Sequence, residues 1–176
     1  LATRMSGKRL GIVGLGRIGM AIAKRAEAFG LAISYYNRSA KPESGYRRFE
    51  KLDDLAANSD FLVVAIAAGP ATSKLVNADV LNALGHNGFF VNIARGAVVD
   101  EDALIEALQN KSIKGAALDV YLNEPDIDGR FLTLENTVLL PHIGSASIET
   151  RKAMGKLVCD NLAAHFAGKP LLTEVK

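Results

Sequence analysis

The sequence predicts an α/β fold in which a doubly wound parallel sheet lies between two layers of helices, three layers in all. Short apolar stretches alternate with helical patterns along nearly the whole of its 176 residues. Residues 9–29 contain an apolar stretch, three glycines in the spacing G-x-G-x-x-G, and then a helical pattern. Alternating strands and helices favour a parallel sheet, because each crossover between parallel strands places a helix on one of its faces.

The individual elements follow from apolar periodicity and from the glycine, proline and capping residues between the apolar stretches. We expect strands over residues 10–13, 32–36, 46–49, 61–67, 88–93, 115–120 and 137–140. We expect helices over residues 17–29, 52–58 and 77–84, after Asp100, and over residues 148–167. Asn77 and Asp100 are expected to cap their helices. In the first helix, one face is expected to carry Ile18, Ala21, Ile22, Ala26 and Phe29, and in the last, Met154, Leu157, Val158, Leu162 and Phe166.

The three glycines after the first strand are typical of a turn that binds a dinucleotide. Gly14 permits the tight turn, Gly16 keeps side-chain atoms away from a pyrophosphate, and Gly19 lets the helix approach the strand. The N–H groups and the positive dipole end of the helix then face the phosphates. Glycines also serve ordinary turns, so the motif depends on the strand before it and the helix after it.

The end of the second strand predicts which dinucleotide is bound. A site selective for NAD usually has an Asp or Glu here, which accepts a hydrogen bond from the ribose 2′-hydroxyl. This chain has Asn37, Arg38 and Ser39 instead. Arg38 would attract a 2′-phosphate and Ser39 would donate to it, which favours NADP(H) over NAD(H), with NAD(H) still possible. The alternative is a solvated turn with an exposed arginine.

Three chemically capable side chains follow three later strands at the same edge of the predicted sheet. Arg95 could bind a carboxylate through two hydrogen bonds. His142 is a natural proton donor near neutral pH, and Glu124 could hold its ring and favour its protonated form. Taken singly, the three would be a surface cation, a solvated loop carboxylate and a turn histidine.

Composition excludes several classes of function. The net charge of +2, with scattered basic residues, does not indicate nucleic-acid binding, and no apolar run approaches the length of a membrane span. A single cysteine leaves no intrachain disulfide and no cysteine metal cluster, so no metal is expected and a reducing, cytoplasmic location fits.

The sequence resembles the Rossmann-type cofactor-binding domain of the D-isomer-specific 2-hydroxyacid dehydrogenases. The stretches that carry this resemblance are residues 11–19, 91–101, 115–121, 123–125 and 140–147. The resemblance implies that Arg95, Glu124 and His142 form a catalytic set. It also implies that Asp119 holds the nicotinamide carboxamide, with Ala94 and Gly144 lining that pocket. Together, the expected cofactor contacts are Gly14, Leu15, Gly16, Arg17, Ile18, Gly19, Asn37, Arg38, Ser39, Thr72, Ile93, Ala94, Arg95, Asp119, His142 and Gly144.

The resemblance further implies an activity. Asn37-Arg38-Ser39 is similar to the NADPH-using glyoxylate, hydroxypyruvate and hydroxyphenylpyruvate reductases of the family, which predicts reduction of a small 2-oxoacid to the D-2-hydroxyacid. We expect residues 1–176 to be one NAD(P)-binding domain of a larger enzyme, without the substrate domain that family members build largely from chain before the glycine motif. A homodimer is expected. The alternatives are a nucleotide sensor similar to the family's corepressors and a purely structural domain.

Overall fold

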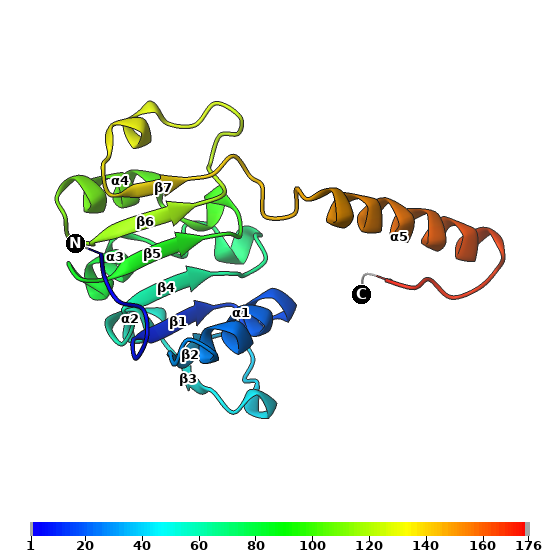
Figure 1. Ribbon diagram of the computed structural model, residues 1–176, viewed down its shortest axis with the longest axis horizontal. Coiled ribbons are helices and arrows are strands. Elements are labelled where there is room, and N and C mark those ends of the chain that lie inside the picture. The colour runs from blue at the N-terminus through cyan, green and yellow to red at the C-terminus, as the bar shows by residue number, and fades with distance from the viewer. Residues whose placement is uncertain (1, 175–176) are drawn as a thin grey trace. The chain divides into compact units, whose positions relative to one another are not determined.

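The computed structural model describes residues 2–174 and contains one parallel sheet of seven strands (Figure 1). The strands are β1 (Arg9–Val13), β2 (Ala32–Tyr36), β3 (Arg47–Phe49), β4 (Phe61–Val64), β5 (Phe89–Asn92), β6 (Gly115–Leu118) and β7 (Thr137–Leu139). The α-helices are α1 (Arg17–Glu27), α2 (Leu52–Ala57), α3 (Ala78–Leu84), α4 (Glu101–Gln109) and α5 (Ile148–Phe166). Short 3-10 helices cover Pro42–Ser44, Pro70–Thr72, Gly96–Val98 and Gly129–Thr133.

The strand order is β3-β2-β1-β4-β5-β6-β7, so the chain starts near the middle of the sheet and builds outwards in both directions (Figure 1). Leu10 of β1 is in register with Ile33 of β2 on one side and with Phe61 of β4 on the other. The order reverses between β1 and β4, and sheets of this kind bind ligands beyond the carboxyl ends of the strands at such a point. The predicted Rossmann-type fold is confirmed.

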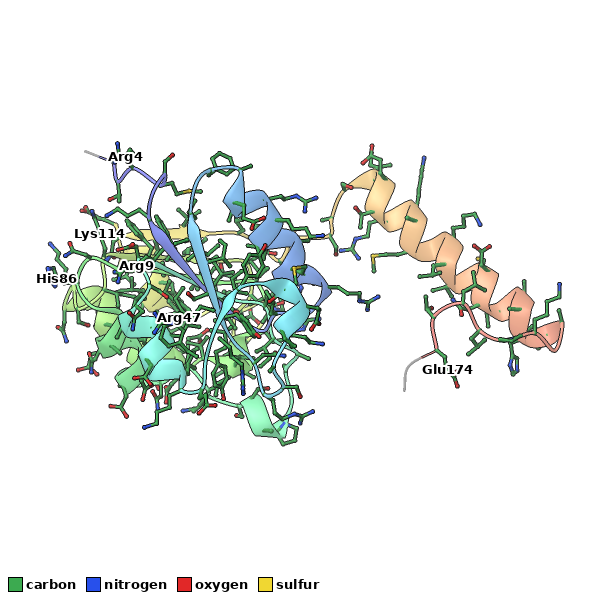
Figure 2. All side chains as sticks on the ribbon, turned by 90° about the horizontal axis from the view of Figure 1, so that it is seen from below. Arg4, Arg9, Arg47, His86, Lys114 and Glu174 are labelled. Atoms are coloured by element: carbon green, nitrogen blue, oxygen red, sulfur yellow. The ribbon has the colours of Figure 1, made fainter. Side chains whose placement is uncertain are left out.

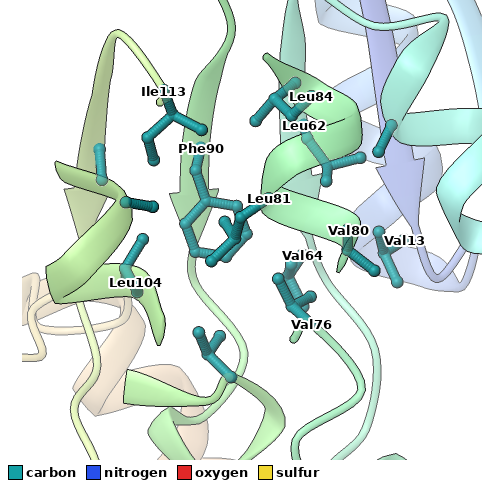
Figure 3. Packing of buried hydrophobic residues seen from close by; sticks show 14 of the residues in the cluster. Val13, Leu62, Val64, Val76, Val80, Leu81, Leu84, Phe90, Leu104 and Ile113 are labelled. Carbon is teal, nitrogen blue, oxygen red and sulfur yellow. The ribbon is translucent and has the colours of Figure 1, made fainter. Parts of the chain in front are cut away.

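Helices cover both faces of the sheet, as the three-layer prediction requires. On one face, residues of α2, α3 and α4 pack with β-strand residues such as Val64 and Phe90 in the larger apolar cluster (Figure 3). On the other face, Ala23 and Ala26 of α1 pack against β1 and β2 in a second cluster. Ile12 belongs to the second cluster and Val13 to the first, which is why β1 is apolar at consecutive positions rather than at alternate ones.

Three central strands are shorter than predicted. β4 ends at Val64 instead of residue 67, β5 at Asn92 instead of residue 93, and β6 at Leu118 instead of residue 120. Backbone pairing extends one residue further, because Ala65 N–H donates to Val13 O at 2.8 Å and Asp119 N–H to Asn92 O at 3.1 Å. The chain then turns away to build the loops above the sheet, so apolar sequence continues beyond the ladder.

The predicted buried face of α1 is wrong in part. Gly19, Ala23 and Ala26 are buried, whereas Ile18 is 62% exposed and Phe29 is 58% exposed. A Cβ on Gly19 would overlap the carbonyl oxygen of Gly14. The helix therefore approaches the sheet most closely through its smallest side chains, and Ile18 points outward. Phe29 lies beyond the helix, which ends at Glu27 instead of residue 29.

The two predicted helix caps differ from each other. Asn77 caps α3 as expected, since its Oδ1 accepts from Val80 N–H at 3.1 Å. Asp100 occupies the N-cap position of α4 without a side-chain capping bond. Its Oδ2 accepts instead from Lys74 Nζ at 3.1 Å, so an ion pair has replaced the cap.

Gly96 brings together the loops that follow β5 and β6. A Cβ at this position would overlap the backbone carbonyl group of Tyr121 and the nitrogen of Leu122. Leu122 N–H also donates to Glu101 Oε1 at 3.0 Å, which ties the loop after β6 to the start of α4. The two loops therefore meet backbone to backbone, and only glycine fits at position 96.

The described chain forms two compact units, one ending at Pro141 and one beginning at His142. The second unit contains α5, which Ser147 caps by accepting from Thr150 N–H at 3.1 Å. The helix forms where predicted, to within one residue at its end. All five of its side chains predicted to share one face are exposed, namely Met154, Leu157, Val158, Leu162 and Phe166.

At the amino end of the sheet, Asp60 joins β4 to the start of β1. Its carboxylate accepts from Arg9 N–H at 2.8 Å and from Arg9 Nε and Nη2 at 3.1 Å each. Figure 2 labels Arg9. Asp60 N–H donates back to Arg9 O at 2.9 Å. The side-chain hydrogen bonds from Arg9 lower the pKa of Asp60, against the opposing effect of desolvation.

We predict that Asp60→Asn weakens the fold in a pH-dependent way. Because the pKa of Asp60 is lowered on folding, its stabilising effect is complete above the unfolded-state pKa of about 3.9 and is lost as pH falls through the folded-state pKa. The variant should be about 0.5–1 kcal/mol less stable at pH 7, with the difference shrinking below about pH 3. Urea unfolding at both pH values measures this, and a difference independent of pH would contradict it.

We predict that Gly96→Ala destabilises the protein by roughly 3 kcal/mol, because backbone must move to make room for the methyl group. Gly129→Ala is the matched control, since Gly129 also begins a 3-10 helix and a Cβ there meets nothing within 4 Å. Thermal unfolding of the two variants compares them. Equal melting temperatures would show that the two loops are not tightly joined.

Candidate functional site

A cavity of about 570 Å³ opens at the carboxyl ends of β1, β4 and β5, where the strand order reverses. It lies within the unit that ends at Pro141. Six of the predicted cofactor contacts line it, and the four lining residues after β4 were not among those predictions. The complete lining is Gly16, Arg17, Ile18, Ala65, Ile66, Ala67, Ala68, Ile93, Ala94 and Arg95.

The turn between β1 and α1 forms one wall of this cavity. Gly14 has φ +98°, and a Cβ there would lie 2.8 Å from the backbone of Ile66, so both conformation and space require glycine. By contrast, a Cβ on Gly16 would meet nothing within 4 Å. Gly16 thus presents open backbone at the N-terminus of α1, and no acidic residue occupies the first turn of that helix. Leu15 is only 2% exposed and packs in the core, so its backbone alone is available to a ligand.

The turn after β2 places Arg38 and Ser39 on the surface, with Asn37 half-buried. Asn37 Nδ2 donates to Ser39 O at 3.0 Å, which folds the turn on itself. Arg48 Nε of β3 also donates to Asn37 O at 3.2 Å. The predicted phosphate-binding side chains therefore project from an ordered turn rather than from a loose loop.

In the loop after β4, the cavity is lined by a residue that was not predicted rather than by the predicted Thr72. Ala67 follows a strand end and lines the cavity, whereas Thr72 is not among the lining residues. The Thr72 hydroxyl accepts from Gly69 N–H at 2.9 Å and lies within 3.1 Å of the carbonyl oxygens of Ala67 and Gly69. Its side chain organises the loop itself.

The loop after β5 is shaped by Asn92, a residue that sequence reasoning missed. Asn92 is 1% exposed; its Oδ1 accepts from Ala94 N–H at 3.0 Å and its Nδ2 donates to Arg95 O at 3.1 Å. These bonds hold the backbone around Arg95, whose Nη1 donates to Ala94 O at 2.6 Å. An amide at the end of an apolar strand was the available signal.

The loop after β6 carries Asp119 and Glu124. Asp119 is 7% exposed, and Glu124 is exposed and accepts from Tyr121 N–H through Oε1 at 2.8 Å. Tyr121 is itself buried, and its hydroxyl donates to Leu140 O at 2.9 Å, across to the chain leaving β7. Burial raises the pKa of the Tyr121 phenol, so it remains a neutral donor.

His142 and Gly144 belong to the second unit, and both are exposed. His142 has φ +55°, the left-handed region that non-glycine residues enter at a cost of about 1–2 kcal/mol. Such backbone conformations occur preferentially at functional sites. The residue follows β7 by three positions.

Two further features concern residues 2–174 only. Within that range, no group of three or more His, Cys, Asp or Glu side chains is arranged to hold a metal ion. No helix in the same range has both the length and the apolar character to cross a membrane.

The chain was compared with known proteins. It is 53% identical over 175 residues to hydroxyphenylpyruvate reductase of Plectranthus scutellarioides and, over the same length, to glyoxylate/hydroxypyruvate reductase A of Arabidopsis thaliana. Each match covers 99% of this chain and 56% of the relative, so the chain spans little more than half the length of these proteins.

Solved structures agree with these matches. The NADPH-dependent glyoxylate/hydroxypyruvate reductase of Sinorhizobium meliloti, in complex with NADP and malonate, superposes with a TM-score of 0.93 at 48% identity. That match covers 96% of this chain and 53% of the other. A 2-hydroxyacid dehydrogenase of Ketogulonicigenium vulgare matches the whole chain and 56% of its own length, with a TM-score of 0.95 at 47% identity.

Residues 1–144 match the model of the NAD binding domain of the D-isomer specific 2-hydroxyacid dehydrogenases. The match spans the glycine turn, the strand-end loops around the cavity, and His142 and Gly144. The chain therefore belongs to the D-isomer specific 2-hydroxyacid dehydrogenase family.

Proposed function

We propose that this chain binds NADP(H), with NAD(H) as a weaker alternative, and serves a reductase that converts a small 2-oxoacid of the glyoxylate, hydroxypyruvate or hydroxyphenylpyruvate type to the D-2-hydroxyacid. The observation that carries the proposal is the cavity at the reversal of strand order, with the open backbone of Gly16 on one side and Arg95 on another. Relatives with these activities support the choice of substrate class.

The residues present fit a dinucleotide. The open space at Gly16 leaves room for a pyrophosphate against the N–H groups of the first turn of α1, and no carboxylate in that turn opposes it. Arg38 offers a cation to a 2′-phosphate at the end of β2. The family resemblance assigns Asp119, just beyond β6, to the nicotinamide carboxamide, and it assigns Ala94 and Gly144 to the lining of that pocket. A cofactor bound in this way supplies the hydride.

The protein's own side chains would divide the remaining work. Arg95 binds the substrate carboxylate through its guanidinium and polarises the neighbouring carbonyl group. His142 gives its proton to the carbonyl oxygen as the alcohol forms. Glu124 favours the protonated imidazole, a role that rests on the family resemblance. Positioning and charge stabilisation at the developing alkoxide account for much of the rate.

We also propose an oligomeric state and a cellular location for the whole protein. We infer a homodimer from the family resemblance. The single cysteine fits a reducing cytoplasm.

We predict that calorimetric titration of the chain shows NADPH binding, and that Arg38→Ala weakens NADPH roughly ten- to a hundredfold while changing NADH little. Such a loss corresponds to one charge-assisted contact, about 1.5–3 kcal/mol. Lys24→Ala removes an exposed cation from the last turn of α1 and serves as the control. If both cofactors weaken equally, Arg38 does not bind the phosphate, and no binding at millimolar NADPH would refute the cofactor proposal.

We predict turnover of 2-oxoacids by the protein at the length its relatives have, with a pH profile that depends on Glu124. Glu124→Gln removes the charge that favours the protonated imidazole. The pH above which the rate of reduction falls should then be lower, and the pH at which the rate of oxidation rises should move in the same direction. His142→Ala should lower the rate about 10²- to 10⁴-fold in both directions while cofactor binding remains.

His86→Ala is the matched control for these profiles. His86 is exposed between α3 and β5, at the amino end of the sheet (Figure 2), whereas the cavity opens at the carboxyl ends of the strands. Its profile should follow that of the wild type. If Glu124→Gln leaves both profiles unmoved, Glu124 does not act on His142. Binding of NADPH without turnover of any 2-oxoacid would favour a sensor instead.

A further inference from the structure

The turn that carries Arg38 is held by a second arginine, Arg48, from the neighbouring strand β3. Arg48 Nε donates to Asn37 O at 3.2 Å, and Arg48 Nη2 donates to Arg38 O at 3.2 Å. These two carbonyl groups belong to the peptide units on either side of the Arg38 Cα. Because peptide units are planar, fixing both of them fixes the direction in which the Arg38 side chain leaves the backbone.

The far end of the same turn is held from the core. Tyr35 is 1% exposed, and its hydroxyl accepts from Lys41 N–H at 2.7 Å. Ser44 Oγ donates to Lys41 O at 2.7 Å. The chain between Asn37 and Lys41 is therefore anchored at both ends, and Arg48 supplies the anchor nearest Arg38.

Charge at this turn adds a second argument. In the described part of the chain, neither Arg38 nor Arg48 forms an ion pair with a carboxylate. Two arginines at one turn concentrate positive charge there, which attracts an anion. Both hydrogen bonds that Arg48 donates go to backbone carbonyl groups of the turn. The Arg38 side chain is therefore the one that can turn towards an anion.

We propose that Arg48 is a positioning residue for cofactor selection: it holds the Arg38 backbone in place, so that only the Arg38 side chain has to be ordered when its guanidinium binds a 2′-phosphate. The inference rests on the proposed function, in which Arg38 binds that phosphate. Preorganisation of this kind raises affinity by reducing the entropy lost on binding. It acts on NADPH and not on NADH, because only NADPH has the phosphate.

The test is calorimetric titration of NADPH and NADH into variants of the chain. Arg48→Gln should weaken NADPH about tenfold and leave NADH within about twofold, which also shows that the variant is folded. Arg48→Lys keeps the charge, but an ammonium lacks the forked geometry that joins two carbonyl groups. It should therefore lose as much NADPH affinity as Arg48→Gln, whereas a direct charge effect would be rescued by lysine.

Arg47→Gln is the matched control. Arg47 precedes Arg48 on the same strand and carries the same charge, and its guanidinium lies 4.4 Å from the centre of the Phe49 ring (Figure 2). Successive strand residues point to opposite faces, so this variant removes a cation without touching the turn. Its NADPH affinity should match that of the wild type.

A double-mutant cycle with Arg38→Ala decides whether Arg48 acts through Arg38. If it does, adding Arg48→Gln to Arg38→Ala should weaken NADPH by no more than about twofold further. Additive losses, rescue by lysine, or equal weakening of both cofactors would each overturn the inference.

The inference and the proposed function can fail separately. If Arg38→Ala abolishes the preference for NADPH and Arg48→Gln leaves it intact, the proposed function stands and the positioning role is wrong. If Arg48→Gln changes the preference and Arg38→Ala does not, Arg38 is not the phosphate ligand, and the role proposed for Arg38 is wrong together with the positioning role of Arg48.

Discussion

The contact between Gly19 of α1 and the carbonyl oxygen of Gly14 is the constraint on which the rest of the site depends. It leaves no room for a Cβ, so α1 lies directly against the end of β1. The helix N-terminus is thereby held over the reversal of strand order, next to the loops from β4 and β5. With a larger residue at position 19 the helix would move outward, and the open backbone at Gly16 would no longer face the cavity.

The candidate site is built largely from backbone that polar side chains, some of them buried, hold in place. Asn92 shapes the loop around Arg95, and the Tyr121 hydroxyl joins the loop after β6 to the chain leaving β7. Thr72 performs the same task within the loop after β4. Exposed charged side chains, such as those of Arg38 and Arg95, thus project from segments whose conformation is already fixed.

Much of the fold could be predicted from sequence, because strands buried on both faces and helices with one apolar face leave clear periodicities. Attention to the residues that directly follow the strands also led to most of the residues that line the cavity, including Gly16 and Arg95. The buried face of α1 was mispredicted because apolarity ranked Ile18 and Phe29 above Gly19, whereas close packing selected the smallest residue. Asn92 and Arg48 were missed for a different reason: their partners are backbone groups, so the sequence does not show which residues they contact, and only the polar amide of Asn92 at the end of an apolar strand stood out.

The pairing of β4 with β1 has a consequence for how the chain folds during synthesis. Arg9 and Asp60, which join the two strands at their starts, are 51 positions apart in the chain. The Gly14 turn is packed against Ile66, so the turn has no wall on that side until the ribosome has released the β4 segment. Closing so long a loop is entropically costly and slows the pairing of non-local strands. The glycine motif is thus synthesised before the segment against which it packs, and its final conformation is a later product of folding.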